Sequence, residues 1–80
     1  MQEAEVRQRL NKVFCDVFDD DSIQIFDAMT ANDVEDWDSM MHVDLVVAVE
    51  HAFTIKFTTK EVNGLANVGD FIRLIGARVR

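Results

Sequence analysis

The sequence predicts an all-α fold: a small four-helix bundle with three longer helices, one short third helix and a long ordered loop between the first two. Three segments carry apolar residues at three- and four-residue spacing, the pattern of an amphipathic helix. TIKF at 54–57 alternates like a strand, but four residues without a partner strand do not make a sheet. Eighty residues form one domain spanning 1–80, and a chain of this length buries only about 60% of its unfolded surface. We therefore expect function at the surface rather than in an enclosed active site.

The first helix is predicted over residues 3–18. Its apolar stripe consists of Val6, Leu10, Val13, Phe14 and Val17. Cys15 falls on the side away from that stripe. Because it is the only cysteine, neither an intrachain disulfide nor a multi-cysteine metal site is possible.

Residues 19–37 are long for a connection without structure of its own. Thr30 and Asp33 resemble a capping pair for one helical turn. We expect an ordered loop, fixed to the core by four apolar side chains: Ile25, Phe26, Met29 and Trp37.

The second helix is predicted over residues 39–53, because Asp38 is a good N-cap and neither Gly nor Pro interrupts the segment. On a helical wheel one broad arc forms the core face: Met41, Leu45, Val46, Ala48, Val49, Ala52 and Phe53. A narrower apolar stripe lies almost opposite and consists of Met40, Val43 and Val47. It is flanked by Asp44 and Glu50 and begins beside Ser39.

Two further helices complete the bundle. Thr58 and Glu61 form a capping box that opens a short helix reaching Leu65. Asn67 then caps a last helix whose C-terminal Arg78 and Arg80 suit the helix dipole. The stripe of this last helix is Val68, Phe71, Ile72, Ile75 and Val79.

The net charge of −7 is unevenly distributed. No Lys or Arg occurs between Val13 and Ile55, whereas this stretch holds eleven acidic residues. Such a field repels nucleic acid and attracts basic protein surfaces. The alternative, that the charge serves only solubility, explains the sign of the charge but explains its segregation less well.

An exposed apolar stripe rimmed by acids is typical of a surface that binds a partner protein. The alternative is that another helix covers the stripe. Since Asp38 caps the helix, the Ser39 hydroxyl is free to face solvent, at the positive end of the helix dipole and near unpaired amides. A phosphoryl group attached to Ser39 would be stabilised there.

The segment DWDSMMHVDLVVAVEHAFTIKF resembles the phosphopantetheine attachment region of acyl carrier proteins. The family pattern is Asp-Ser followed by Leu or Met at a helix start, then an acidic Val- and Leu-rich helix ending in E-x-x-F. The resemblance extends over nearly the whole chain, since the predicted elements follow the family order. TANDVEDWDS is most similar to discrete carriers of polyketide-type or other specialised pathways rather than of housekeeping fatty acid biosynthesis.

The resemblance implies a role for each residue of the motif. Ser39 would receive a 4′-phosphopantetheine arm beside the motif residue Asp38. The apolar partner contacts would be Met40, Val43 and Val47, and the acidic ones Asp44 and Glu50. Met40 replaces the more usual Leu, a volume-conserving change. His51 stands where many relatives carry an acid, which weakens the negative field there.

The resemblance further implies a non-enzymatic carrier, with no catalytic residue and no metal site. A phosphopantetheinyl transferase would attach the arm from coenzyme A, and acyl groups would then travel as thioesters on its thiol. Acyl-loading, ketosynthase-type and acyl-transfer enzymes would recognise the carrier through basic grooves. We expect a cytoplasmic monomer without membrane insertion, because no apolar run approaches the roughly 18 residues of a membrane span and the N-terminal residues lack a secretory pattern.

Three alternatives stay open. Ser39 and His42, three residues apart, could form a hydrolase pair, but no nucleophile elbow or oxyanion hole accompanies them, and His42 points toward the buried arc. The acidic run at 19–22 could bind calcium, but it lacks the required glycine and bidentate glutamate. The serious alternative is an acidic helical interaction module without a prosthetic group.

Overall fold

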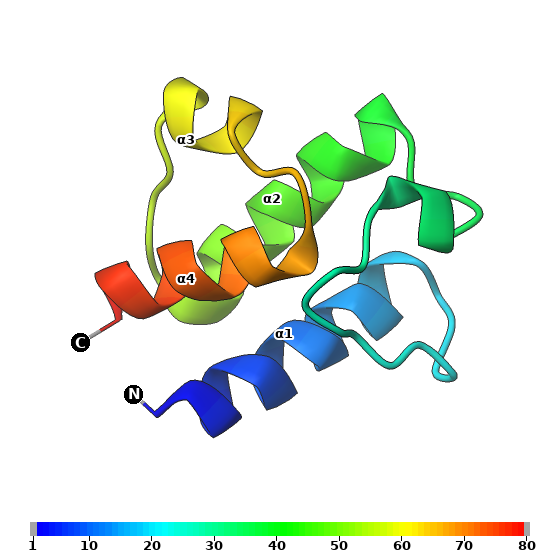
Figure 1. Cartoon of the computed structure of the whole chain (residues 1–80), viewed down its shortest axis with the longest axis horizontal. Coiled ribbons are helices and arrows are strands. Elements are labelled where there is room, and N and C mark those ends of the chain that lie inside the picture. The colour runs from blue at the N-terminus through cyan, green and yellow to red at the C-terminus, as the bar shows by residue number, and fades with distance from the viewer. Residues whose placement is uncertain (1, 80) are drawn as a thin grey trace.

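The structure, a computed structural model, describes residues 2–79, and every regular element within them is helical. The elements are α1 (Glu3–Val17), the one-turn 3-10 helix η1 (Ala31–Asp33), α2 (Ser39–Phe53), α3 (Thr59–Asn63) and α4 (Val68–Arg78) (Figure 1). This confirms the predicted all-α architecture. The short helix α3 ends at Asn63 rather than at Leu65, and Arg80 lies outside the described residues.

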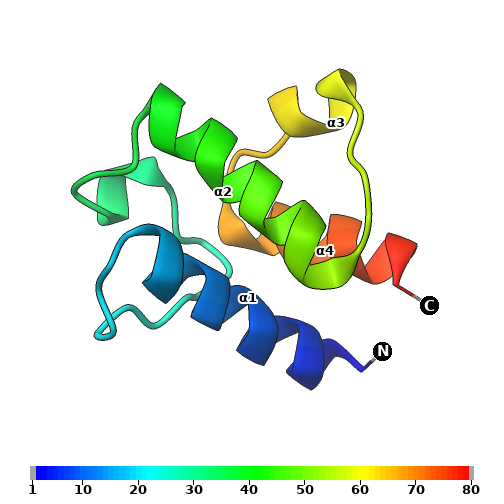
Figure 2. The same cartoon turned by 180° about the vertical axis from the view of Figure 1, so that it is seen from behind.

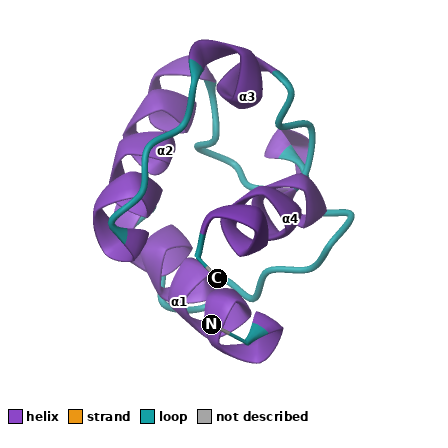
Figure 3. Ribbon diagram, turned by 90° about the vertical axis from the view of Figure 1, so that its left-hand side faces the viewer, coloured by secondary structure: helices purple, strands orange, loops and turns teal. Residues whose placement is uncertain are grey.

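Helix α1 contacts both α2 and α4, and these three helices enclose the core. Figures 2 and 3 show the short helix α3 at the opposite end of the molecule from α1. Phe14 lies at the centre of the core, and its ring meets those of Trp37 and Phe71 edge to face. The other buried apolar residues are Val6, Leu10, Val13, Met29, Leu45, Val46, Val49, Phe53, Val68, Ile72 and Ile75.

The predicted helix starts are confirmed by their side-chain hydrogen bonds. Asn67 Oδ1 accepts the amide of Asp70 at 2.9 Å at the start of α4. Thr58 and Glu61 form the predicted capping box of α3. Thr30 and Asp33 do the same for η1, so the turn between α1 and α2 is built as the sequence predicted.

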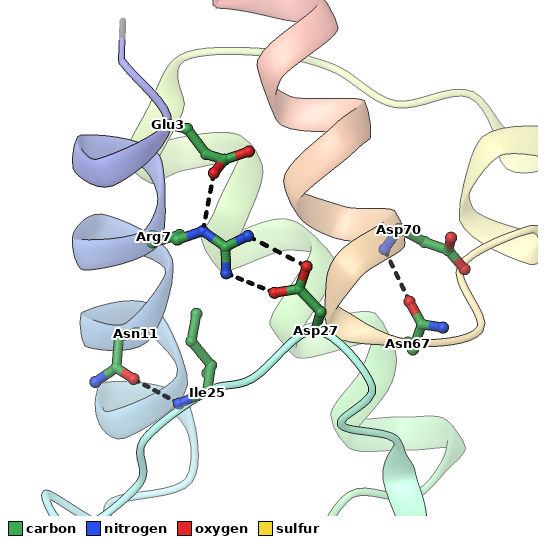
Figure 4. Close-up of polar contacts among 7 residues, drawn as sticks. All are labelled: Glu3, Arg7, Asn11, Ile25, Asp27, Asn67 and Asp70. Carbon is green, nitrogen blue, oxygen red and sulfur yellow. Dashed lines mark hydrogen bonds and ion pairs between the residues drawn. The ribbon is translucent and has the colours of Figure 1, made fainter.

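The long loop is held against α1 by two polar side chains (Figure 4). Asn11 accepts the amide of Ile25 at 2.8 Å and donates to the carbonyl of Ile23 at 3.1 Å. Arg7 binds both carboxylate oxygens of Asp27, at 2.5 and 3.2 Å. These contacts, which join residues 12 to 20 positions apart, make the loop an ordered part of the fold.

The loop prediction was wrong for one of its four apolar anchors. Met29 and Trp37 are buried and Ile25 is half-buried, but the Phe26 side chain is 49% exposed. A turn joins the Phe26 carbonyl to the Met29 amide, and the Met29 carbonyl in turn accepts the amide of Val68. The loop is therefore fixed to the start of α4 through Met29, which leaves Phe26 outside the core.

The buried arc of α2 is narrower than predicted. Leu45, Val46, Val49 and Phe53 are buried, whereas Met41 and Ala48 are half-buried and Ala52 is exposed. The prediction of a buried Ala52 was wrong, since this residue lies outside the part of α2 that the rest of the chain covers. No helix within residues 2–79 is long and apolar enough to cross a lipid bilayer.

Candidate functional site

Ser39 is the first residue of α2, and its side chain is exposed. The preceding residue, Asp38, has extended backbone and caps the helix, its carboxylate accepting the amide of Met41 at 2.9 Å. The Ser39 hydroxyl makes no hydrogen bond to any residue in 2–79 and is therefore available to solvent. Figure 1 shows the start of α2 at the outer edge of the molecule.

The electrostatics at the start of α2 favour an anion on Ser39. The first amides of a helix have no partner within the helix, and the aligned peptide dipoles place partial positive charge there. Asp38 occupies only one of these amides with its side chain. The remaining ones can hydrogen bond a phosphate attached to Ser39.

The apolar stripe of α2 is exposed, as predicted. Met40, Val43 and Val47 are 79%, 59% and 45% exposed, and no other helix within residues 2–79 covers them. Asp44 is exposed beside them and forms no ion pair with a described residue. We call Met40, Val43 and Val47 the exposed strip; its partner-binding role stays a prediction.

Glu50, predicted as a rim acid, has a second role. Its carboxylate accepts the backbone amide of Phe57 at 2.7 Å and is half-buried. This bond ties the end of α2 to the segment leading into α3. The sequence alone did not indicate it, because the amide that Glu50 binds lies beyond the helix, in a stretch without regular structure.

An open groove of about 590 Å³ lies beside Ser39. One wall comes from Trp37 and His42, whose rings stack with centroids 6.0 Å apart. The Trp37 indole N–H donates to His42 Nδ1 at 3.2 Å. The further lining residues are Ala31, Asp38, Ser39, Val43, Val62, Asn63, Leu65 and Ala66.

The residues that α3 and its following turn contribute to this groove were not predicted as site residues. Val62 on α3 and Leu65 in the turn after it are both half-buried, and α3 is too short to form a stripe. Two apolar residues three positions apart, soon after the Ser39 helix, are the signal that could have indicated them. The groove thus joins the helix that bears Ser39 to α3.

A second hollow of about 510 Å³ lies at the far end of the exposed strip, lined by Val47, Glu50, His51, Thr54, Ile55 and Lys56. Lys56 is the first base after the acidic stretch. His51 is exposed. It stands where the resemblance led us to expect an acid in many relatives, and so a weaker negative field in this chain. The strip therefore runs from an acidic end near Ser39 to a mixed end near Lys56.

Some acids of the stretch between Val13 and Ile55 form ion pairs with basic side chains. Asp27 is neutralised by Arg7, whose guanidinium hydrogen bonds hold the pKa of the Asp27 carboxyl below its ordinary value. Asp16 lies 3.9 Å from Lys12. The acids that remain without an ion pair among residues 2–79 include Asp38 and Asp44, which both lie on or beside the first turns of α2.

The geometry gives no support to a hydrolase or a calcium site. His42 Nδ1 is engaged by Trp37, and no hydrogen bond joins His42 to Ser39. Asp20 accepts the amide and hydroxyl of Ser22, forming a local turn. Within the described chain, no three His, Cys, Asp or Glu side chains converge as a metal site requires.

Comparison with solved structures decides the family. The solution NMR structure of a holo acyl carrier protein from Geobacter metallireducens matches this chain with a TM-score of 0.84. The two sequences are 41% identical over a match that covers 89% of this chain and 82% of the other. The chain belongs to the acyl carrier protein family. No family model and no curated protein matches it.

Membership of the acyl carrier protein family confirms the function class that the sequence predicted. The protein is a carrier of acyl groups rather than an enzyme. A carrier needs no catalytic constellation, so neither the groove nor the exposed strip has to be part of an enzyme active site.

Proposed function

We propose that this acyl carrier protein holds acyl intermediates as thioesters on a 4′-phosphopantetheine arm attached to Ser39. The observation that carries the proposal is the exposed, unbonded Ser39 hydroxyl at the N-terminus of α2. The acyl carrier protein from Geobacter metallireducens was solved in its holo form, which supports the same group here.

The residues around Ser39 fit such an arm. The helix N-terminus suits its phosphate, and the adjoining groove offers apolar walls with a few polar atoms for the remainder. Asp38 keeps the helix start fixed while leaving the serine oxygen accessible. When attached, the arm supplies the thiol that forms the thioester.

The attachment step requires only an acceptor from this chain. The Ser39 oxygen would form the new bond to the phosphorus of the 4′-phosphopantetheine moiety of coenzyme A, losing its proton to the transferase. The bond to adenosine 3′,5′-bisphosphate would break, and this product would leave. A phosphopantetheinyl transferase with a magnesium ion supplies the catalysis.

The exposed strip and the neighbouring acids would form the docking surface for partner enzymes. Met40, Val43 and Val47 offer apolar contact, and Asp44 offers an unpaired charge to a basic groove. Glu50 would contribute less than Asp44, because its carboxylate is already bound to Phe57. The partners in question are the transferase and the acyl-loading, ketosynthase-type and acyl-transfer enzymes of a biosynthetic pathway.

We place the protein in the cytoplasm, as a monomer, in a polyketide-type or other specialised pathway. The segment from Thr30 to Ser39, with Trp37 directly before the Asp-Ser pair, supports the pathway assignment. The indole of Trp37 closes one side of the groove beside Ser39, so the residue that suggests the pathway also shapes the site.

Intact mass spectrometry tests the proposal. The chain has two serines, Ser22 and Ser39, so Ser22→Ala is a matched control for Ser39→Ala. After incubation with coenzyme A, magnesium and a broad-specificity transferase, wild type and Ser22→Ala should each gain a single arm, and Ser39→Ala none. An unchanged mass of the folded wild type would favour the interaction module without a prosthetic group.

A further inference from the structure

His42 presents a hydrogen-bond donor that the fold does not use. Its ring is stacked on Trp37 and meets the ring of Phe71 at an interplanar angle of 61°. These two aromatic neighbours and the indole hydrogen bond fix the orientation of the imidazole. The ring lines the groove beside Ser39, one turn along α2.

The hydrogen bond from Trp37 determines the tautomer of neutral His42. Nδ1 accepts the indole N–H, so the imidazole proton must reside on Nε2. Nε2 makes no hydrogen bond within residues 2–79. Among the described residues, every fully buried side-chain nitrogen or oxygen has a hydrogen-bond partner. Since Nε2 has no partner among these residues, it is not fully buried. A residue that lines the groove therefore carries an N–H donor of fixed orientation that has no partner among the described residues.

The other polar residues of the groove cannot supply the same function. Asp38 can only accept hydrogen bonds when ionised, and one of its oxygens caps α2. Asn63 is exposed at the end of α3 and is not fixed by a hydrogen bond to another described side chain. His42 is the donor that neighbouring side chains hold in place.

We propose that His42 Nε2–H binds a carbonyl or hydroxyl oxygen of the group tethered to Ser39, and so positions that group in the groove. This inference rests on the proposed function. The acceptor oxygen can come from the arm itself or from the acyl chain that it carries. In either case His42 acts as a positioning residue and takes no part in chemistry.

Imidazole nitrogen NMR tests the proposal on the loaded protein. Four states of the ¹⁵N-labelled chain are compared: apo, holo with a free thiol, butyryl-loaded and 3-hydroxybutyryl-loaded. We expect the Nε2 resonance to shift on loading while Nδ1 stays unprotonated. A shift already present in the free-thiol form identifies an oxygen of the arm, and one that first appears with butyryl identifies the thioester carbonyl. A shift confined to the 3-hydroxybutyryl form identifies the acyl hydroxyl.

Two variants test the consequence for the carried group. His42→Phe keeps an aromatic ring between Trp37 and Phe71 but removes both nitrogens, whereas His42→Gln keeps one donor and one acceptor. We expect hydrolysis of the acyl thioester to accelerate by roughly two- to tenfold in His42→Phe, the effect of one lost hydrogen bond, and to be restored toward wild type in His42→Gln.

The outcomes separate this inference from the proposed function. If intact mass shows the arm on Ser39 but the Nε2 resonance is the same in all four states, the positioning role is overturned and the carrier function stands. Equal hydrolysis rates in wild type and folded His42→Phe would also overturn it. If no arm is attached at all, the proposed function itself fails.

Discussion

The carboxylate of Glu50 accepts the backbone amide of Phe57 at 2.7 Å, which joins the last turn of α2 to the segment before α3. Glu50 thus combines a structural bond with a position beside the exposed strip. Asp44 lies about two turns earlier on α2 and is also acidic, but its carboxylate makes no such hydrogen bond to the backbone of a described residue. The pair allows the structural and the docking roles of acids on this helix to be separated.

Glu50→Ala should lower the free energy of unfolding by about 1–3 kcal/mol, because the Phe57 amide loses a charged partner. Glu50→Gln keeps an acceptor oxygen and should lose less. Asp44→Asn should leave stability within about 0.5 kcal/mol of wild type but slow transferase-catalysed loading, most clearly at low salt. Urea unfolding and loading kinetics measure the two effects. Equal stability of Glu50→Ala and Asp44→Asn would contradict the structural role of Glu50.

Truncation of a buried and of an exposed apolar residue of α2 should affect different properties, stability in the first case and loading rate in the second. Leu45 is fully buried, so Leu45→Ala should cost about 2–5 kcal/mol of stability. Val43 is 59% exposed, so Val43→Ala should change stability by less than about 0.5 kcal/mol while reducing the rate of loading by the transferase. Thermal unfolding and a loading assay check both. A strongly destabilised Val43→Ala would show that the strip is covered in solution.

The backbone of Thr54 should be a site of strain. It ends α2 with φ 54° and ψ 50°, in the left-handed region that β-branched residues rarely adopt. Thr54→Asn should therefore raise the free energy of unfolding by roughly 0.5–1 kcal/mol, since Asn tolerates this conformation. Chemical denaturation gives the value. A destabilised Thr54→Asn would mean that the threonine side chain makes a favourable contact that outweighs the strain.

Acid should weaken the fold partly through Asp27. Hydrogen bonds from Arg7 lower the pKa of Asp27 in the folded state, so the unfolded chain binds more protons as pH falls. The stability from this pair is fully present above the unfolded pKa and is lost as pH falls through the folded one. Asp27→Asn should flatten the decline of stability between about pH 5 and pH 2, as measured by urea unfolding at each pH. An unchanged decline would exclude a contribution from this pair.

Local signals predicted most of the fold. Asp38, Thr58 and Asn67 each cap the helix that the sequence assigned to them, because capping depends on residues within one turn. The exposed strip was likewise predictable, since a second apolar face cannot be buried in so small a bundle. The same local reasoning identified Ser39 as the free hydroxyl at the helix start.

Contacts between distant segments were beyond the sequence pattern. The Arg7–Asp27 pair joins residues 20 positions apart, and nothing local indicates it. Phe26 was expected in the core, but the turn that directs Met29 inward leaves it exposed. His42 was expected to point toward the buried arc, and the structure shows it half-buried with a hydrogen bond from Trp37 that the pattern did not indicate.

Fragment mass spectrometry of the loaded protein tests the central claim most directly. The chain offers three hydroxyl or thiol side chains of Ser or Cys: Cys15, Ser22 and Ser39. After treatment with coenzyme A and transferase, proteolysis and fragmentation should locate a single phosphopantetheine on Ser39 and none on the other two. An arm found on any other residue, or a fully folded chain with Ser39 unmodified, would contradict the account.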